Sequence, residues 1–133
     1  MAQTNFFQKV LLLIFSLFLS FIILELGLRL AQSGFLFIQY QQNQESLNKS
    51  HEYRIMCIGE STTALGGENS YPSQLQKILD KANKPHRYTV INQGVPGIGS
   101  DYIKDHFKDW LNQYKPQVVV IMMGINDNNS LIP

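Results

Sequence analysis

The chain has 133 residues, a net charge of +1 and a single cysteine, and 44% of its residues are hydrophobic. The near-neutral charge without a basic cluster disfavours nucleic acid as a partner. Because Cys57 is the single cysteine, the chain can form neither an intramolecular disulfide nor a CxxC metal site. We interpret Cys57 as a small buried hydrophobe.

The first quarter of the chain is almost entirely apolar, over residues 6–30. About 20 apolar residues at ~1.5 Å each match a hydrocarbon core ~30 Å thick. We therefore predict an amino-terminal membrane anchor at residues 1–31. A cleaved signal peptide is the alternative, but no Ala-x-Ala motif precedes the polar segment that follows. Lys9 and Arg29 nearly balance each other across the span, and we expect the amino terminus inside and the domain on the extracytoplasmic side.

Residues 32–52 contain a glutamine-rich polar run and lack sustained hydrophobic periodicity. Such a stretch between an apolar span and a patterned region is typical of a linker. We therefore predict a juxtamembrane linker at residues 32–52 and a folded part at residues 53–133.

Three short apolar runs in this folded part are expected strands, at residues 54–58, 88–91 and 117–123. Continuous apolar strands are buried on both faces, which is the mark of a parallel sheet. Residues 71–83 and 100–114, between the strands, are expected helices because their apolar residues recur at helical spacing. The two predicted stripes are Leu75, Ile78, Leu79 and Ala82, and Ile103, Phe107, Trp110 and Leu111.

Alternating strands and helices predict an α/β fold, a three-layer α/β/α flavodoxin-like parallel sheet. Right-handed crossovers place the first strand between the other two, in the order 2-1-3. The loops after all three strands then meet at one sheet edge, where such folds bind ligands. The roughly 80 residues are few for such a sheet, and its third strand would be an exposed apolar edge. We therefore expect the domain to be incomplete in this chain.

Each expected strand is followed by a polar, glycine-containing loop, at residues 59–63, 92–97 and 124–127. Ser61 occupies a strand-to-helix turn, which can hold a nucleophilic hydroxyl clear of its surroundings. The backbone N–H groups of Ser61 and Gly97 and the Asn126 amide could stabilise an oxyanion, each contributing ~3 to 4 kcal/mol. Taken singly, Ser61 is better explained as a helix cap or turn serine, and Gly97 and Asn126 are equally well explained as turn residues. Their occurrence together favours an acyl-transfer site.

The glycines at residues 94–99 follow the pattern Gly-x-x-Gly-x-Gly, which differs from the Gly-x-Gly-x-x-Gly of a dinucleotide site. The chain also lacks the Gly-Lys-Ser or Gly-Lys-Thr of a phosphate loop. We expect neither an organic cofactor nor a metal.

The three loops resemble blocks I, II and III of the SGNH hydrolases, also called the GDSL esterase and lipase family, over about residues 54–128. The resemblance implies that Ser61 is the nucleophile and that Gly97 and Asn126 complete the oxyanion hole. It also implies a catalytic Asp and His from a late Asp-x-x-His motif. Tyr71-Pro72 and residues 24–29 of the anchor resemble membrane-anchored bacterial members of the family.

Two departures from the family pattern stand out. Glu60 replaces the aspartate of Gly-Asp-Ser, and no Asp-x-x-His occurs in the 133 residues. His51, His86 and His106 do not occupy the late position, and we interpret them as surface or packing residues. A serine without its base retains only the ~10³ to 10⁴-fold enhancement of oxyanion hole and binding. We therefore expect this chain alone to be inactive or nearly so.

The leading hypothesis is the amino-terminal part of a membrane-anchored SGNH-type serine hydrolase acting on acyl or acetyl esters of carbohydrate or lipid. An O-acyltransferase of the same fold would pass the acyl group to a sugar hydroxyl. A non-catalytic, membrane-anchored binding or scaffold protein is the remaining alternative. The sequence leaves the oligomeric state open.

Overall fold

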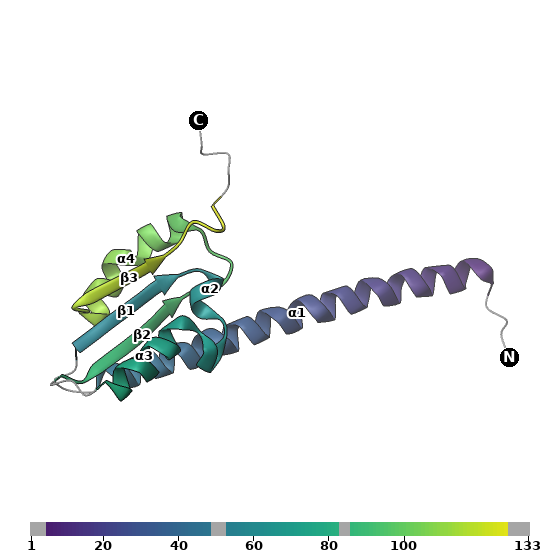
Figure 1. Cartoon of the computed structure of the whole chain (residues 1–133). Helices are drawn as coiled ribbons and strands as arrows, with labels where there is room; N and C mark the ends of the chain where they lie inside the picture. Colours follow the sequence, from purple (N-terminus) through teal and green to yellow (C-terminus); the bar gives the residue numbers. More distant parts are fainter. Residues whose placement is uncertain (1–4, 49–52, 83–85, 128–133) are drawn as a thin grey trace. The chain divides into compact units, whose positions relative to one another are not determined.

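The computed structural model describes residues 5–48, 53–82 and 86–127 (Figure 1). Its elements in chain order are α1 (Phe6–Leu47), β1 (Tyr53–Gly59), α2 (Ser61–Ala64), the 3-10 helix η1 (Gly67–Asn69), α3 (Tyr71–Lys81), β2 (Tyr88–Gly94), α4 (Ser100–Tyr114) and β3 (Val118–Met122). The chain divides into two compact units, Met1–Ile38 and Gln39–Pro133.

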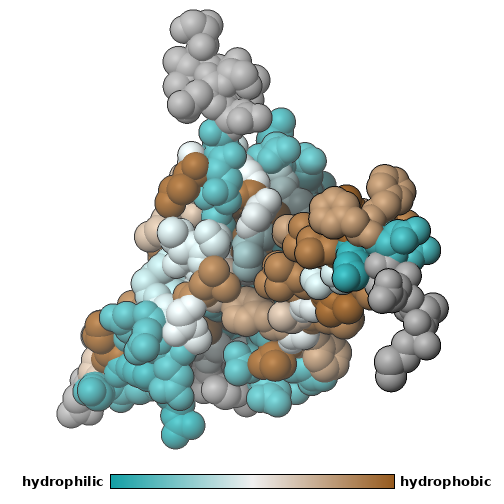
Figure 2. Space-filling model, turned by 90° about the vertical axis from the view of Figure 1, so that its right-hand side faces the viewer, coloured by the Kyte–Doolittle hydropathy of each residue, from teal (hydrophilic) through white to brown (hydrophobic). Residues whose placement is uncertain are grey.

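The first unit is the apolar part of α1. Its large hydrophobic side chains are exposed, as at Phe18 and Ile23, and Figure 2 shows hydrophobic side chains gathered on the visible part of this helix. Glu25 and Arg29 form an i,i+4 ion pair of 2.8 Å on its surface. Within the described part of the chain, α1 is the one helix that is long and apolar enough to cross a membrane, by length and composition.

The helix α1 continues to Leu47, so most of the predicted linker is helical. Residues 32–47 contain no proline, and the glutamine, glutamate and leucine among them favour a helix. Gln39 and Asn43 are buried in this segment. The last residues of the predicted linker, 49–52, lie outside the described residues. The division of the chain at residues 31 and 52 stays a prediction.

The second unit contains a three-stranded parallel sheet in the order β2-β1-β3, with β1 in the middle (Figure 1). Ile55 of β1 pairs with Val90 of β2 and with Val118 of β3. The predicted parallel sheet and its strand order are therefore confirmed, as is the incomplete α/β architecture with one long apolar amino-terminal helix.

The main core lies between the sheet and α4. Met56 and Ile58 of β1 and Ile91 of β2 pack against one face of this helix, in a buried cluster completed by Ile103, Trp110 and Tyr114. The predicted helix at residues 100–114 is found with these bounds. Cys57 is fully buried as predicted, and this burial raises the pKa of its thiol.

On the other side of the sheet from α4, α3 packs mainly against β2 (Figure 1). The predicted apolar stripe of this helix is only partly covered. Leu75 and Leu79 are half-buried, but Ile78 is 65% exposed, so its inclusion in the buried stripe was wrong. The physical reason is that β2 is an edge strand, which offers the helix a narrow surface.

The outer edge of β2 is covered by side-chain carboxamides. Gln76 of α3 accepts a hydrogen bond from the Val90 N–H (2.6 Å) and donates one to the Tyr88 carbonyl (3.0 Å). A single carboxamide thus imitates the donor and acceptor of a neighbouring strand. Unpaired strand edges invite unwanted pairing with other chains, and this edge is blocked at its first residues.

The opposite edge of the sheet is different. Val119 of β3 packs against the core, whereas Val118, Val120, Ile121 and Met122 are exposed. An apolar strand of a parallel sheet is normally covered on both faces. The predicted exposed apolar edge is therefore present in the structure.

Candidate active site

The loops after the three strands come together at the carboxyl edge of the sheet. Ser61 is half-buried and is the first residue of α2, directly after Glu60. Gly97 lies in the loop between β2 and α4, and Asn126 lies in the loop after β3. Hydrogen bonds of Glu60, Asn126 and Asp127 connect these loops to one another.

Two glycines allow α2 to pack closely on the ends of the strands. A Cβ atom on Gly59 would collide with the Thr63 hydroxyl and the Met122 carbonyl oxygen. A Cβ atom on Gly94 would collide with the backbone of Ala64. Any side chain at these positions would therefore push the turn that carries Ser61 away from the sheet.

Glu60 connects the loop after β1 to the loop after β3. Its side chain is only 1% exposed. One carboxylate oxygen accepts a hydrogen bond from the Gly124 N–H (2.7 Å), and the other accepts one from the Asn126 N–H (3.1 Å). Hydrogen bonds to an ionised acceptor are roughly twice as strong as neutral ones, which offsets the cost of burying the group.

Asn126 extends this connection to the loop after β2. Its side-chain amide donates a hydrogen bond to the Ile98 carbonyl oxygen (2.9 Å). The neighbouring Gly97 has a φ of +79°, a conformation that favours glycine. Through its backbone and side chain, Asn126 therefore joins the residue before Ser61 to the residue after Gly97. The structure thus brings together the three loops of the predicted site residues.

Asp127 makes a second link between the same loops. Its Oδ1 accepts a hydrogen bond from the N–H of Ser100, the first residue of α4 (2.8 Å). Hydrogen bonding to Ser100 lowers the pKa of the Asp127 carboxyl, and the positive end of a helix favours a negative charge in this position. Asp127 belongs to the predicted loop at residues 124–127, but its link to Ser100 was not predicted. An acidic residue at that point gives no sign of which amide it will meet.

Below the Ser61 turn, Tyr71 contributes a buried hydroxyl close to Thr63 and Cys57. Burial, together with the neighbouring Cys57, raises the pKa of Tyr71 to about 12. The phenol therefore keeps its proton at neutral pH. Tyr71 does not supply the base that a serine nucleophile needs.

The described histidines also lie outside the three loops. His106 is within α4, stacked on Tyr102 at a centroid distance of 3.9 Å, and its Nδ1 hydrogen-bonds with the Tyr102 carbonyl (2.9 Å). His86 is exposed just before β2, and His51 is outside the described residues. Residues 5–48, 53–82 and 86–127 contain no group of three or more His, Cys, Asp or Glu side chains that could hold a metal ion.

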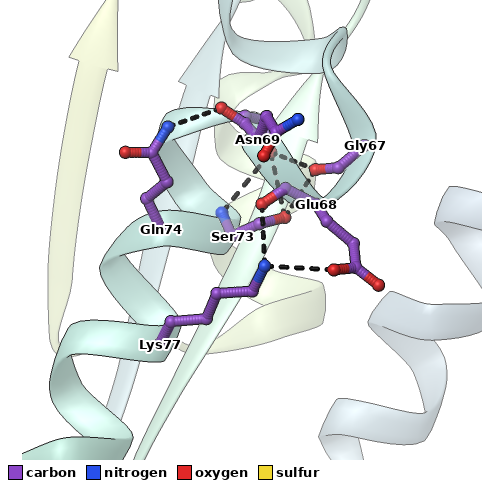
Figure 3. A network of polar contacts seen from close by, with 7 residues as sticks. Gly67, Glu68, Asn69, Ser73, Gln74 and Lys77 are labelled. Atoms are coloured by element: carbon purple, nitrogen blue, oxygen red, sulfur yellow. Dashed lines mark hydrogen bonds and ion pairs between the residues drawn. The ribbon is translucent and has the colours of Figure 1, made fainter.

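A polar network holds the segment between α2 and α3 (Figure 3). Ser70 caps α3 by accepting from the Ser73 N–H, and the Ser73 hydroxyl donates to the Gly67 carbonyl (2.8 Å). Lys77 reaches Glu68 at 3.1 Å, an exposed pair that contributes little to stability. The backbone that leaves the Ser61 turn is thus tied to the start of α3.

The fold and the three connected loops describe an α/β domain with a polar site at its carboxyl edge. The model of the GDSL-like lipase/acylhydrolase family matches residues 57–133, which include all three loops. The chain therefore belongs to the GDSL-like lipase/acylhydrolase family. Neither the curated proteins nor the solved structures contain a match.

We predict that Glu60→Gln lowers the free energy of unfolding by about 2 kcal/mol, because an N–H₂ group then faces one of two buried N–H donors. Urea denaturation followed by Trp110 fluorescence measures the change. Glu68→Gln is the matched control, since its carboxylate is 90% exposed, and it should leave the midpoint unchanged. Equal midpoints for both variants would show that Glu60 does not hold the loops.

We predict a pH dependence at the link between Asp127 and Ser100. The folded pKa of Asp127 is lowered. Its contribution to the stability of the folded state is therefore present above the unfolded pKa and is lost as the pH falls through the folded pKa. The Ser100 amide resonance should therefore shift with a midpoint below the usual aspartate pKa. In Asp127→Asn this shift should disappear, and its persistence would assign the titration to another group.

Proposed function

We propose that this chain carries the nucleophile and the oxyanion hole of a serine ester hydrolase. Ser61 Oγ attacks the ester carbonyl and passes its proton to a base, the C–O bond to the leaving alcohol breaks, and water then releases the acid from the acyl-enzyme. The backbone N–H groups of Ser61 and Gly97 and the side-chain amide of Asn126 stabilise the oxyanion. The observation that carries the proposal is the pair of hydrogen bonds that Asn126 makes, one to Glu60 and one to Ile98.

The chemistry of the Asn126 amide is compatible with this role. A carboxamide carries two N–H hydrogens, and the bond to Ile98 uses one of them. The other is the donor that the proposal assigns to the oxyanion. The fixed position of the amide reduces the reorganisation needed when negative charge develops.

The base is part of the same proposal. No Asp-x-x-His occurs in the 133 residues, so we assign the catalytic pair to a segment that lies outside them and packs beside β3. Support comes from the exposed apolar side chains of this strand, such as Val120 and Ile121. The family match supports an acylhydrolase in general, and within that class the proposed substrate is an acyl or acetyl ester of carbohydrate or lipid.

The missing histidine also favours a second candidate function, a non-catalytic, membrane-anchored binding protein. In that case the loops around Ser61 and Gly97 would present a surface without chemistry. The labelling experiment below separates the two functions, because only the hydrolase requires a reactive serine.

We predict that a fluorophosphonate labels Ser61 slowly in the 133-residue chain and rapidly in a form that carries the Asp-x-x-His pair. Ser61→Ala should abolish labelling, whereas Thr62→Ala, which removes the adjacent exposed hydroxyl, should leave it unchanged. Peptide mass spectrometry identifies the modified residue. Ester turnover by the chain alone should fall ~10³-fold or more below the form with the pair, given the size of base effects in serine hydrolases. Labelling that survives in Ser61→Ala would sink the assignment of the nucleophile.

We also propose that α1 anchors the chain in a membrane by a single span, with the sheet on the extracytoplasmic side. The length and apolar composition of α1 support the span. Lys9 and Arg29 nearly balance each other across it, so the orientation is the part of the proposal that the experiment decides. Protease added to sealed inside-out vesicles of the host membrane should leave the 39–133 unit intact, and detergent should expose it. Digestion of this unit in sealed vesicles would reverse the proposed topology.

A further inference from the structure

We propose that Gln39 and Asn43, in the carboxyl-terminal part of α1, are positioning residues for the loop that carries Gly97. Both side chains are buried. Gln39 Nε2 donates a hydrogen bond to the Gly94 carbonyl (2.9 Å), and Asn43 Nδ2 donates one to the Asn92 carbonyl (2.7 Å). The link to catalysis rests on the proposed hydrolase function, and the link to the loop does not.

The spacing of the two carboxamides matches the spacing of the two carbonyls. Residues four apart on a helix share one face and are separated by ~6 Å along its axis. Residues two apart on a strand point the same way and are separated by ~6.6 Å. Because Gln39 meets residue 94 and Asn43 meets residue 92, the helix segment runs antiparallel to β2. Its two amides therefore follow the strand edge in register.

The bond from Gln39 lies at the start of the loop that carries Gly97. Gly94 is the last residue of β2, and the next residue, Val95, donates its N–H to the Gly59 carbonyl (3.0 Å). The loop thus begins between a bond to β1 on one side and a bond to Gln39 on the other. Its far end is held by Asn126 at Ile98. Loss of the Gln39 bond would release one of the supports on which the position of Gly97 depends.

The backbone around Gly94, to which Gln39 binds, has little room to move. Gly94 already lies against the backbone of Ala64, so closely that it leaves no space for a Cβ atom. The Asn92 side chain adds a local brace, because its Oδ1 accepts from the Gly94 N–H (3.0 Å) and its Nδ2 donates to the Thr63 carbonyl (3.2 Å). The end of β2 is therefore fixed between α2 and the segment of α1 that carries Gln39.

The end of α1 is fastened to the same unit. Arg54 of β1 donates to the carbonyls of Leu47 and Tyr114, both at 3.3 Å. These are the last residues of α1 and α4, so one guanidinium group caps two helix ends, where a positive charge is favoured. Leu47 also packs against the core cluster. The segment of residues 39–47 is thus held at its start by the bonds of Gln39 and Asn43 and at its end by the bond of Arg54 to Leu47.

The experiment compares the full chain in lipid nanodiscs with the double variant Gln39→Ala/Asn43→Ala. Hydrogen exchange is measured by mass spectrometry for peptides that cover residues 94–99 and, separately, β1. Loss of two buried hydrogen bonds should accelerate exchange at residues 94–99 about tenfold or more, with β1 unchanged. The matched control is Gln41→Ala, an exposed glutamine on the same helix, which should behave like the unmodified chain.

Unchanged exchange at residues 94–99, or an equal acceleration in β1, would overturn the proposal, because the amides would then be irrelevant or merely stabilising. If the double variant does not fold, Gln39→Met decides the matter. This variant keeps the bulk of the side chain and removes the N–H donor to Gly94. It should accelerate exchange at residues 94–99 while leaving β1 unchanged, and an unchanged loop would refute the role of Gln39.

The rate of fluorophosphonate labelling at Ser61 supplies the catalytic readout. We expect labelling to slow about tenfold in the double variant and to stay unchanged in Gln41→Ala. Unchanged labelling in the double variant, with a loosened loop, would refute positioning for the reaction. If even a form that carries the Asp-x-x-His pair does not label, the proposed hydrolase function fails, and the exchange result alone decides whether Gln39 and Asn43 hold the loop.

Discussion

The buried carboxylate of Glu60 is the constraint on which the arrangement of the loops depends. A charged group that is almost fully removed from water is tolerated only when its oxygens accept strong hydrogen bonds, and the amides of Gly124 and Asn126 supply them. Since Glu60 follows β1 and its partners follow β3, one side chain sets the distance between two loops. Asn126 connects these two loops to the loop after β2 by its hydrogen bond to the Ile98 carbonyl.

The same principle recurs throughout the unit formed by residues 39–133. Backbone groups that the short sheet leaves without a strand partner are satisfied by side chains from distant parts of the chain. Gln76 binds the first residues of β2, and Gln39 and Asn43 bind its last residues. In the same way, Asp127 binds the amide of Ser100 at the start of α4. A small sheet gains order in this way without further strands, because each buried backbone group that finds a partner avoids a desolvation cost.

The parallel sheet, its strand order and the helix at residues 100–114 were predictable because apolar periodicity and crossover handedness determine them. The meeting of the three loops at one edge, with Ser61, Gly97 and Asn126 on them, followed from that topology. Helix propensity alone could have indicated that α1 continues to Leu47, but the roles of Gln39 and Asp127 were not predictable. Isolated polar residues leave no periodic signal, and their partners lie 27 or more residues away. The catalytic roles stay a prediction, since periodicity does not report the direction of a donor.

The unequal edges of the sheet have a consequence for assembly. Side-chain carboxamides bind several of the backbone donors and acceptors at the β2 edge, whereas β3 offers exposed apolar side chains such as Val120 and Ile121. A further strand is therefore more easily added beside β3 than beside β2. A strand from elsewhere in the same polypeptide and a β3 strand from a second copy would compete for this single position. Pairing of two β3 strands would leave a β2 strand at each outer edge, where the carboxamides disfavour further pairing.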